Sequence, residues 1–153
     1  MSEARQVTDL PLLSHFKQFY QDIRHTPLDD VPMLYTDNVV FKDPIHKVIG
    51  LAELRSYLER MNKNVIEGKF VYLDQLVGAS SAYIKWDMHF RHPRLGERPI
   101  TVRGMSHIQF TDRIHFHEDT YDLGSMLYEH VPVIGAGVRF LKHRLAQAAG
   151  DRR

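Results

Sequence analysis

The sequence predicts an α+β protein in which helices come first and a curved antiparallel sheet follows. Apolar residues recur with helical spacing between residues 12 and 61. From Val65 onward the period changes toward two, and turn-forming residues at 78–81, 93–99 and 111–112 divide the chain into strands. Helices and strands that are segregated in this way form α+β folds, in which helices cover one face of a sheet. We therefore expect three N-terminal helices on the concave face of the sheet, with a pocket beside them.

Composition sets limits on the class of protein. The chain has 153 residues, 43% of them hydrophobic, which suits one domain over residues 1–153. Its 20 basic and 19 acidic residues are interspersed, so a nucleic-acid partner is not expected. With no cysteine, disulfides and thiolate metal sites are excluded. The N-terminal residues lack an apolar signal segment and no apolar run approaches the roughly 20 residues of a membrane span, so we expect a cytoplasmic protein without a membrane span.

The first predicted helix is amphipathic. Thr8 or Asp9 can cap it, and Pro11 is tolerated in its first turn. Its apolar face follows the i, i+3, i+4, i+7 pattern through Leu12, Leu13, Phe16, Phe19, Tyr20 and Ile23. Thr26-Pro27 ends it.

Two further helices are expected before residue 65. A short one contains Leu28 and Val31 and ends near Tyr35. Gly50 opens a longer one, and its core face consists of Leu51, Leu54, Leu58 and Met61. Between them, residues 39–41 form a short strand that stops at Asp43-Pro44, because a residue before proline is restricted to extended geometry.

The strands from residue 82 onward alternate clearly enough to assign faces. In residues 82–91 the inward set is Ile84, Trp86, Met88 and Phe90. In residues 100–110 the inward set is Gly104, Ser106, Ile108 and Phe110. Residues 113–122 place His115, His117, Asp119 and Tyr121 on one strand face. That face is either a solvent-exposed edge or the wall of a pocket, where each polar group needs a partner.

Residues 123–150 extend beyond the core, which we place at about 8–122. The extension is expected to be partly helical. A dimer element is the first interpretation; a lid or a surface-lying amphipathic helix are alternatives. Tyr83 and His107 would approach a dimer interface on the outer face of the sheet.

The order of elements carries a resemblance. Leu34-Tyr35-Thr36-Asp37-Asn38, then Val40-Phe41-Lys42-Asp43-Pro44, then Gly50 opening a helix, resembles the SnoaL-like, nuclear-transport-factor-2-like superfamily over residues 8–122. The resemblance implies a ketosteroid-isomerase-like, cystatin-like cone. Relatives include isomerases, polyketide cyclases, epoxide hydrolases, dehydratases and pure binding domains, so it implies fold more strongly than activity.

The residue-level similarity is greatest to ketosteroid isomerases. There, the acidic residue before proline at this strand end is the general base, and that position is Asp43. This chain departs from the oxyanion hole of that family. The position of the family's acid falls near Ser106, and that of its tyrosine falls near Phe19, with Tyr20 one residue away. The resemblance also turns His117, Asp119 and Tyr121 inward, which favours the pocket. Asp43 has an alternative role as a turn residue that caps the following loop.

These inferences predict a small-molecule-binding domain, for which a catalytic and a non-catalytic role are the two alternatives. An isomerase, cyclase or hydrolase would use a carboxylate and an imidazole on a small organic substrate; the alternative is a non-catalytic ligand-binding or association module. A homodimer is expected. The candidate catalytic residues are Asp43, His117 and Asp119, and the candidate substrate-binding residues are Tyr20, Trp86, Met88, Phe90, Ser106 and Tyr121.

The spacing His115-x-His117-x-Asp119 also fits metal ligands. Neighbouring side chains on one strand diverge, and His46 or His89 would have to complete the set. We therefore expect neither a metal nor another cofactor.

Overall fold

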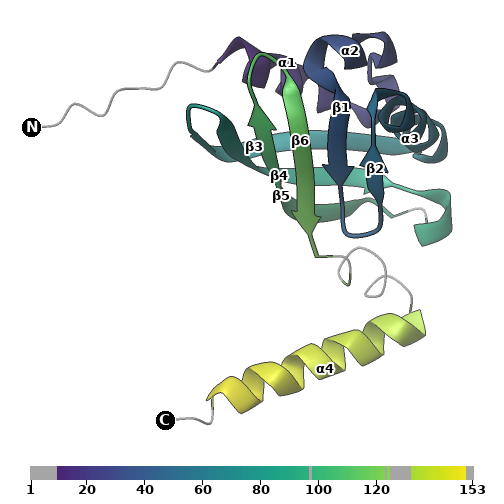
Figure 1. The fold of residues 1–153 in the computed structure, drawn as a ribbon. Coiled ribbons are helices and arrows are strands. Elements are labelled where there is room, and N and C mark those ends of the chain that lie inside the picture. Colours follow the sequence, from purple (N-terminus) through teal and green to yellow (C-terminus); the bar gives the residue numbers. More distant parts are fainter. Residues whose placement is uncertain (1–9, 97, 123, 125–131, 151–153) are drawn as a thin grey trace, which may run out of the picture.

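A computed structural model describes residues 10–96, 98–122, 124 and 132–150. Helices α1 (Pro11–Tyr20), α2 (Val31–Leu34) and α3 (Leu51–Asn64) gather on one side of a curved sheet (Figure 1). Two short 3-10 turns, η1 (Ile23–His25) and η2 (Leu28–Asp30), connect α1 to α2. The fold is the expected α+β cone, with the helices on the concave face.

The six-stranded sheet has the order β2-β1-β6-β5-β4-β3. Its strands are β1 (Tyr35–Lys42), β2 (Lys47–Ile49), β3 (Glu67–Val77), β4 (Ser81–Arg91), β5 (Ile100–Phe110) and β6 (Ile114–Tyr121), with the 3-10 turn η3 (Pro93–Leu95) between β4 and β5. Strands β3 to β6 form the expected antiparallel meander. Strands β1 and β6 pair in parallel, so the sheet is mixed and mostly antiparallel.

Alternation in β4 and β5 follows the prediction. Ile84, Trp86 and Phe90 are buried on the inner face, and Ser106 and Ile108 are buried opposite them on β5. Glycine at 104 is required by this packing, because a Cβ there would lie 2.3 Å from the Trp86 ring. The absence of a side chain on β5 therefore creates the space for the indole on β4.

Helix boundaries differ modestly from the predictions. Thr8 and Asp9, the predicted caps of the first helix, lie outside the described residues. Leu10 occupies the N-cap position of α1 without a side-chain cap, and Pro11 begins the helix. The helix ends at Tyr20, and Ile23 belongs to η1. Gly50, with φ of 93°, precedes α3 as expected.

Strand β1 is longer than the sequence indicates. It begins at Tyr35 and not near Val39, because Tyr35 pairs with Ile114 of β6 and its side chain is fully buried. Strand β2 was not predicted; it is a three-residue strand that pairs with the end of β1. The start of β1 depends on a partner that is distant in the sequence, and β2 is too short to show a period. Local periodicity therefore reveals neither feature.

The face assignment for residues 113–122 is wrong at its start. Gln109 pairs with Phe116, and Phe110 with Ile114, which leaves His115 as an extra residue in a bulge. Ile114 and His117 are both buried, although strict alternation places them on opposite faces. His115 therefore does not continue the row formed by His117, Asp119 and Tyr121.

The main core joins the inner faces of α1, α2 and α3 to the sheet. Leu13, Phe16, Leu54 and Ile108 are among its fully buried members. The predicted helical extension contains α4 (Pro132–Gly150), and residues 123 and 125–131 of the same extension lie outside the described residues. Phe140, Leu141 and Leu145 on α4 are exposed. Among the described helices, none combines the length and apolar character that crossing a membrane requires.

Candidate functional site

A cavity of about 410 Å³ opens between α3, the end of β4, the end of β6 and the turn after β1. Its apolar wall consists of Ile23, Ile45, Met61, Val65, Met88 and Phe90. Two tyrosines, Tyr57 from α3 and Tyr121 from β6, add phenol groups to this wall. Ligand sites are commonly apolar cavities of roughly 300 to 1,000 Å³ with a few polar groups, so the size and lining suit a small organic molecule.

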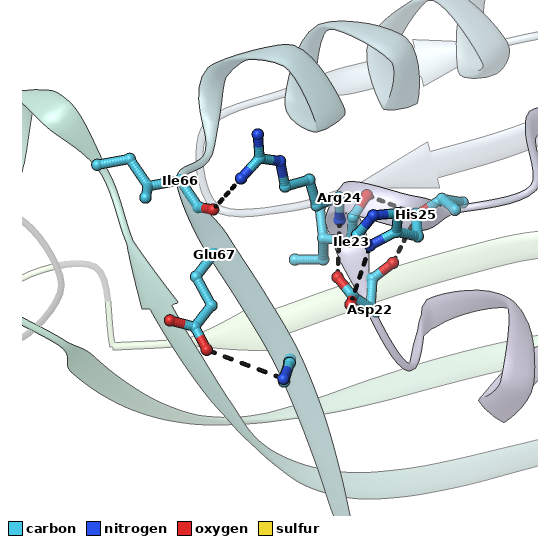
Figure 2. Close-up of polar contacts among 8 residues, drawn as sticks. Asp22, Ile23, Arg24, His25, Ile66 and Glu67 are labelled. Carbon is cyan, nitrogen blue, oxygen red and sulfur yellow. Dashed lines mark hydrogen bonds and ion pairs between the residues drawn. The ribbon is translucent and has the colours of Figure 1, made fainter.

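The turn η1 supplies Ile23 to the cavity wall, and Figure 2 shows the polar contacts around this turn. The Asp22 carboxylate accepts a hydrogen bond from the Arg24 backbone N–H at 3.1 Å and contacts His25 Nδ1 at 3.1 Å. The Arg24 guanidinium donates to the Ile66 carbonyl oxygen at 3.0 Å. Ile23 packs so closely on β3 that a Cβ at Gly68 would lie 3.0 Å from its side chain. Ile23 is thereby fixed as part of the cavity wall.

Asp43 is a turn residue and also faces the cavity wall. Its Oδ1 accepts hydrogen bonds from the backbone N–H groups of Ile45 at 2.8 Å and His46 at 2.6 Å. Its Oδ2 accepts a hydrogen bond from the Tyr57 hydroxyl. The carboxylate is only 5% exposed. The turn role considered from the sequence is therefore present, and the catalytic role stays a prediction; Tyr57, which contacts Asp43, is the residue that lines the cavity.

His46 brings an imidazole to the same turn. Its Nδ1 lies 3.5 Å from Asp43 Oδ1, and its side chain is half exposed. The ring packs near Tyr57, with ring centroids 5.2 Å apart, and lines the cavity. A carboxylate beside one ring nitrogen favours the tautomer that leaves the other nitrogen as an acceptor. Asp43 can orient His46 in this way.

A second polar cluster lies deeper in the cone around His117, which is 1% exposed. His117 Nε2 lies 2.7 Å from Asp119 Oδ1, and His117 Nδ1 lies 2.8 Å from the Tyr35 hydroxyl. Tyr20 and Tyr35 hydroxyls are 2.5 Å apart. If His117 carries its proton on Nε2, Tyr35 donates to Nδ1 and Tyr20 donates to Tyr35. The hydrogen bonds from Tyr20 through Tyr35 and His117 then all run in one direction and end at Asp119.

Asp119 also accepts a hydrogen bond from Ser106 on β5, and Ser106 is in turn held by Trp86. Ser106 Oγ donates to Asp119 Oδ1 at 2.5 Å and accepts from Trp86 Nε1 at 2.9 Å. The carboxylate therefore receives two hydrogen bonds on one oxygen, which suits an ionised group in a low-dielectric site. The void beside this cluster measures about 10 Å³. It has room for at most about one water molecule, so the cluster is packed polar core.

The charges of Asp43 and Asp119 act on the two tyrosines of the cavity wall. Burial raises the pKa of Tyr57, and the hydrogen bond and charge of Asp43 raise it further. Burial likewise raises the pKa of Tyr121, with added contributions from Asp43 and Asp119. Both phenols therefore stay protonated at neutral pH. Among the described residues no hydrogen bond engages the Tyr121 hydroxyl, whereas Tyr57 already donates to Asp43.

The structure divides the residues chosen from the sequence between two places. Met88, Phe90 and Tyr121 line the open cavity, and Asp43 lies directly behind it. The buried cluster contains Tyr20, Trp86, Ser106, His117 and Asp119.

Sequence reasoning missed Tyr57 and His46 as cavity residues. Tyr57 follows Leu54 by three positions and precedes Met61 by four, so the helical period did indicate its face. His46 has a weaker signal, namely its place three residues after a turn-forming aspartate.

No group of three or more His, Asp or Glu side chains suited to a metal occurs within residues 10–96, 98–122, 124 and 132–150. The expectation of a site without metal or cofactor stays a prediction.

The family follows from a sequence comparison. The model of the SnoaL-like domain matches residues 16–115. The chain belongs to this family. A search of curated proteins returned no match for this SnoaL-like domain.

Solved structures share the fold of the SnoaL-like domain at low sequence identity. A hypothetical protein with a ketosteroid isomerase-like fold from Catenulispora acidiphila, in complex with trimethylamine, has a TM-score of 0.69 at 13% identity, covering 78% of this chain and 92% of that one. A Mycobacterium tuberculosis epoxide hydrolase has a TM-score of 0.62 at 14% identity, with 75% and 83% covered. TerC, co-crystallized with polyporic acid, has a TM-score of 0.65 at 11% identity, with 76% and 95% covered. At these identities the likeness establishes the fold alone.

Proposed function

We propose that this SnoaL-like domain binds a small organic molecule in the 410 Å³ cavity and transfers a proton there, in an isomerisation, cyclisation or hydrolysis. The observation that carries the proposal is the Asp43–His46 pair at the wall of an apolar cavity. A carboxylate and an imidazole are the groups expected from the sequence. The imidazole that accompanies Asp43 is His46, because both nitrogens of His117 are already engaged.

In the proposed step, His46 Nε2 accepts a proton from a carbon acid or from an attacking water. Asp43 holds the Nδ1–H and stabilises the imidazolium that forms, as a positioning residue. The imidazolium then returns the proton to another carbon in an isomerisation, or to the leaving oxygen in a hydrolysis. The 3.5 Å separation suits a ligand-free site, where catalytic hydrogen bonds are often long.

Tyr121 is the proposed donor to oxygen. Its raised pKa keeps the hydroxyl protonated, so it can donate a hydrogen bond to a carbonyl that becomes an oxyanion. Asp119 lies two residues earlier on β6 and is held by Ser106 and His117. The buried cluster thus positions the strand that carries Tyr121, which gives His117 and Asp119 a supporting role.

A non-catalytic binding module is the second candidate. It is favoured by the fact that neither Asp43 nor Asp119 is among the residues that line the open cavity. Each carboxylate is also engaged by several donors. In this case Tyr57 and Tyr121 serve only to orient a ligand.

Turnover of a probe panel separates the two candidates. The panel contains aliphatic and aryl epoxides, β,γ-unsaturated cyclic ketones and β-keto esters. We expect Asp43→Asn and His46→Gln each to lower kcat by about 10²- to 10⁴-fold. Asparagine retains the turn, because its side chain also accepts backbone hydrogen bonds. Asp37→Asn, an exposed position on β1, the strand that leads into the Asp43 turn, is the matched control and should leave kcat unchanged.

The outcomes are distinct. Full turnover in His46→Gln contradicts the assignment of the base. Saturable binding of a panel member, with no turnover in any variant or in the wild type, supports the binding module. Far-ultraviolet circular dichroism of each variant checks that the fold persists.

A further inference from the structure

We propose that the ligand is amphipathic, with an apolar body and a carboxylate or comparable anionic group that binds between Arg60 and Arg94 at the cavity mouth. This inference rests on the proposed function of the same cavity and adds the charge and orientation of its ligand. It begins with the charges of the lining residues. Four of them are basic side chains, His46, Arg60, His92 and Arg94, and none is Asp or Glu.

The basic lining is not a reflection of the whole chain. With 20 basic and 19 acidic residues, the protein has a formal net charge of only +1. A cavity wall with basic groups and no acidic group therefore concentrates positive charge locally. Such a concave wall raises the local concentration of anions and selects for them.

Arg60 and Arg94 also differ from several other arginines in the described part of the chain, which have ion-pair or hydrogen-bond partners. Arg55 pairs with Asp29 at 3.0 Å, and Arg103 pairs with Asp87 at 2.8 Å. Arg24 is occupied with the Ile66 carbonyl (Figure 2). Within the part of the chain that the structure describes, no ion pair or side-chain hydrogen bond engages the guanidinium of Arg60 or Arg94. Both are exposed at the mouth and available to a planar carboxylate, which guanidinium groups bind through paired hydrogen bonds.

The inner end of the cavity has the opposite electrostatic character. The charge of Asp43 raises the pKa of both Tyr57 and Tyr121, and Asp119 adds to this effect. An anion placed inside would therefore be repelled, whereas Met88 and Phe90 favour an apolar group. The ligand is thus oriented with its anionic group outward and its uncharged body toward Met88, Phe90 and Tyr121.

The cavity volume limits the size of this body. At about 410 Å³ it lies toward the lower end of the roughly 300 to 1,000 Å³ range of ligand sites. A small ligand is therefore expected. An aryl-substituted short-chain carboxylate has this size.

A series of three probes with one body tests the charge. Binding of 4-phenylbutyrate, 4-phenylbutanol and 4-phenylbutylamine is measured by isothermal titration calorimetry at low salt and in 0.5 M NaCl. We expect the carboxylate to bind about tenfold or more tightly than the alcohol, which corresponds to about 1.4 kcal/mol. The amine should bind most weakly. Salt should weaken the carboxylate and leave the alcohol nearly unchanged, because screening acts on charges.

Variants locate the anionic group. Arg60→Gln and Arg94→Gln should each weaken the carboxylate by roughly three- to tenfold. The double variant should remove the preference over the alcohol. Arg55→Gln is the matched control, since Arg55 lies on the same helix but pairs with Asp29. It should leave all three affinities unchanged.

Three results overturn the inference. They are equal affinity of wild type for carboxylate and alcohol, equal loss in Arg55→Gln and Arg60→Gln, and no saturation by any probe. The proposed function is judged separately by turnover in Asp43→Asn and His46→Gln. If Phe90→Ala weakens carboxylate and alcohol alike while the two bind equally, the cavity is a ligand site and only the anion preference is wrong.

Discussion

Alkaline unfolding of this protein should be steep, because its tyrosines are buried. Burial raises the pKa of Tyr20, and burial together with the adjacent Tyr20 raises that of Tyr35. Burial also raises the pKa of Tyr57, Tyr72 and Tyr121. In the unfolded chain each of these groups ionises near pH 10.

The sign and size of the effect follow from proton binding. Below about pH 10 both states hold their phenol protons and stability does not depend on these groups. Above it, the unfolded chain releases protons that the folded chain retains, so stability falls as pH rises. Each tyrosine contributes about 1.4 kcal/mol per pH unit. At pH 11 the fully buried Tyr20 and Tyr35 account for about 3 kcal/mol, and all five for up to about 7 kcal/mol, against a typical domain stability of about 5 to 15 kcal/mol.

The assay follows tyrosinate absorbance at 295 nm and far-ultraviolet circular dichroism along one pH titration. Five of the seven tyrosines should ionise only as the protein unfolds, so most of the absorbance change should coincide with loss of ellipticity. If most of the absorbance appears between pH 10 and 11 while the ellipticity is unchanged, these phenols titrate in the folded state and the reasoning from burial is refuted.

Three further predictions concern the sheet. Gly104→Ala should lower stability by roughly 1 to 3 kcal/mol in urea titrations, because its Cβ would overlap the Trp86 ring; unchanged stability would contradict the packing. Ser106→Ala should cost roughly 1 to 3 kcal/mol, since it leaves the buried Trp86 N–H without its acceptor; a blue shift of indole fluorescence with no stability loss would argue against it. Tyr83 and Met105 are exposed apolar side chains on the outer face of the sheet, and we predict a homodimer through this face. Sedimentation velocity should show a dimer for the wild type and a monomer for a Tyr83→Glu, Met105→Glu double variant. A monomeric wild type would contradict the prediction.

The parts of the fold that local patterns determine were predictable. The alternation of Ile84, Trp86 and Phe90 identified both the strand and its inner face, because a half-buried strand requires period two. The parallel pairing of β1 with β6 was not predictable, since it depends on contacts between distant segments. His115 was misplaced for a related reason: a bulge adds one residue, and every face assignment before it is reversed.

The candidate site was predictable in its residue types more than in its pairings. Asp43 was chosen from its place before a proline, and the structure adds that Tyr57 and His46 are its neighbours. A sequence pattern cannot show how the surroundings of two carboxylates differ, one in the turn after β1 and the other within β6. Asp119 is enclosed by donors from β5 and β6, whereas Asp43 lies behind one phenol at an open cavity.

The parallel pairing of β1 with β6 also has a consequence for biosynthesis. Tyr35 pairs with Ile114, so this pairing cannot form until the ribosome has synthesised the chain from Tyr35 to Ile114. At a translation rate of about 5 to 20 residues per second, this interval is roughly 4 to 16 seconds. During that time β1 has only the three-residue β2 as a strand partner, and Val39 and Phe41, which are buried in the finished fold, lack the β6 side of their enclosure. A nascent chain stalled before residue 114 would therefore have β1 without its β6 partner, with an unpaired strand edge and exposed apolar side chains. Chaperones bind nascent surfaces of this kind.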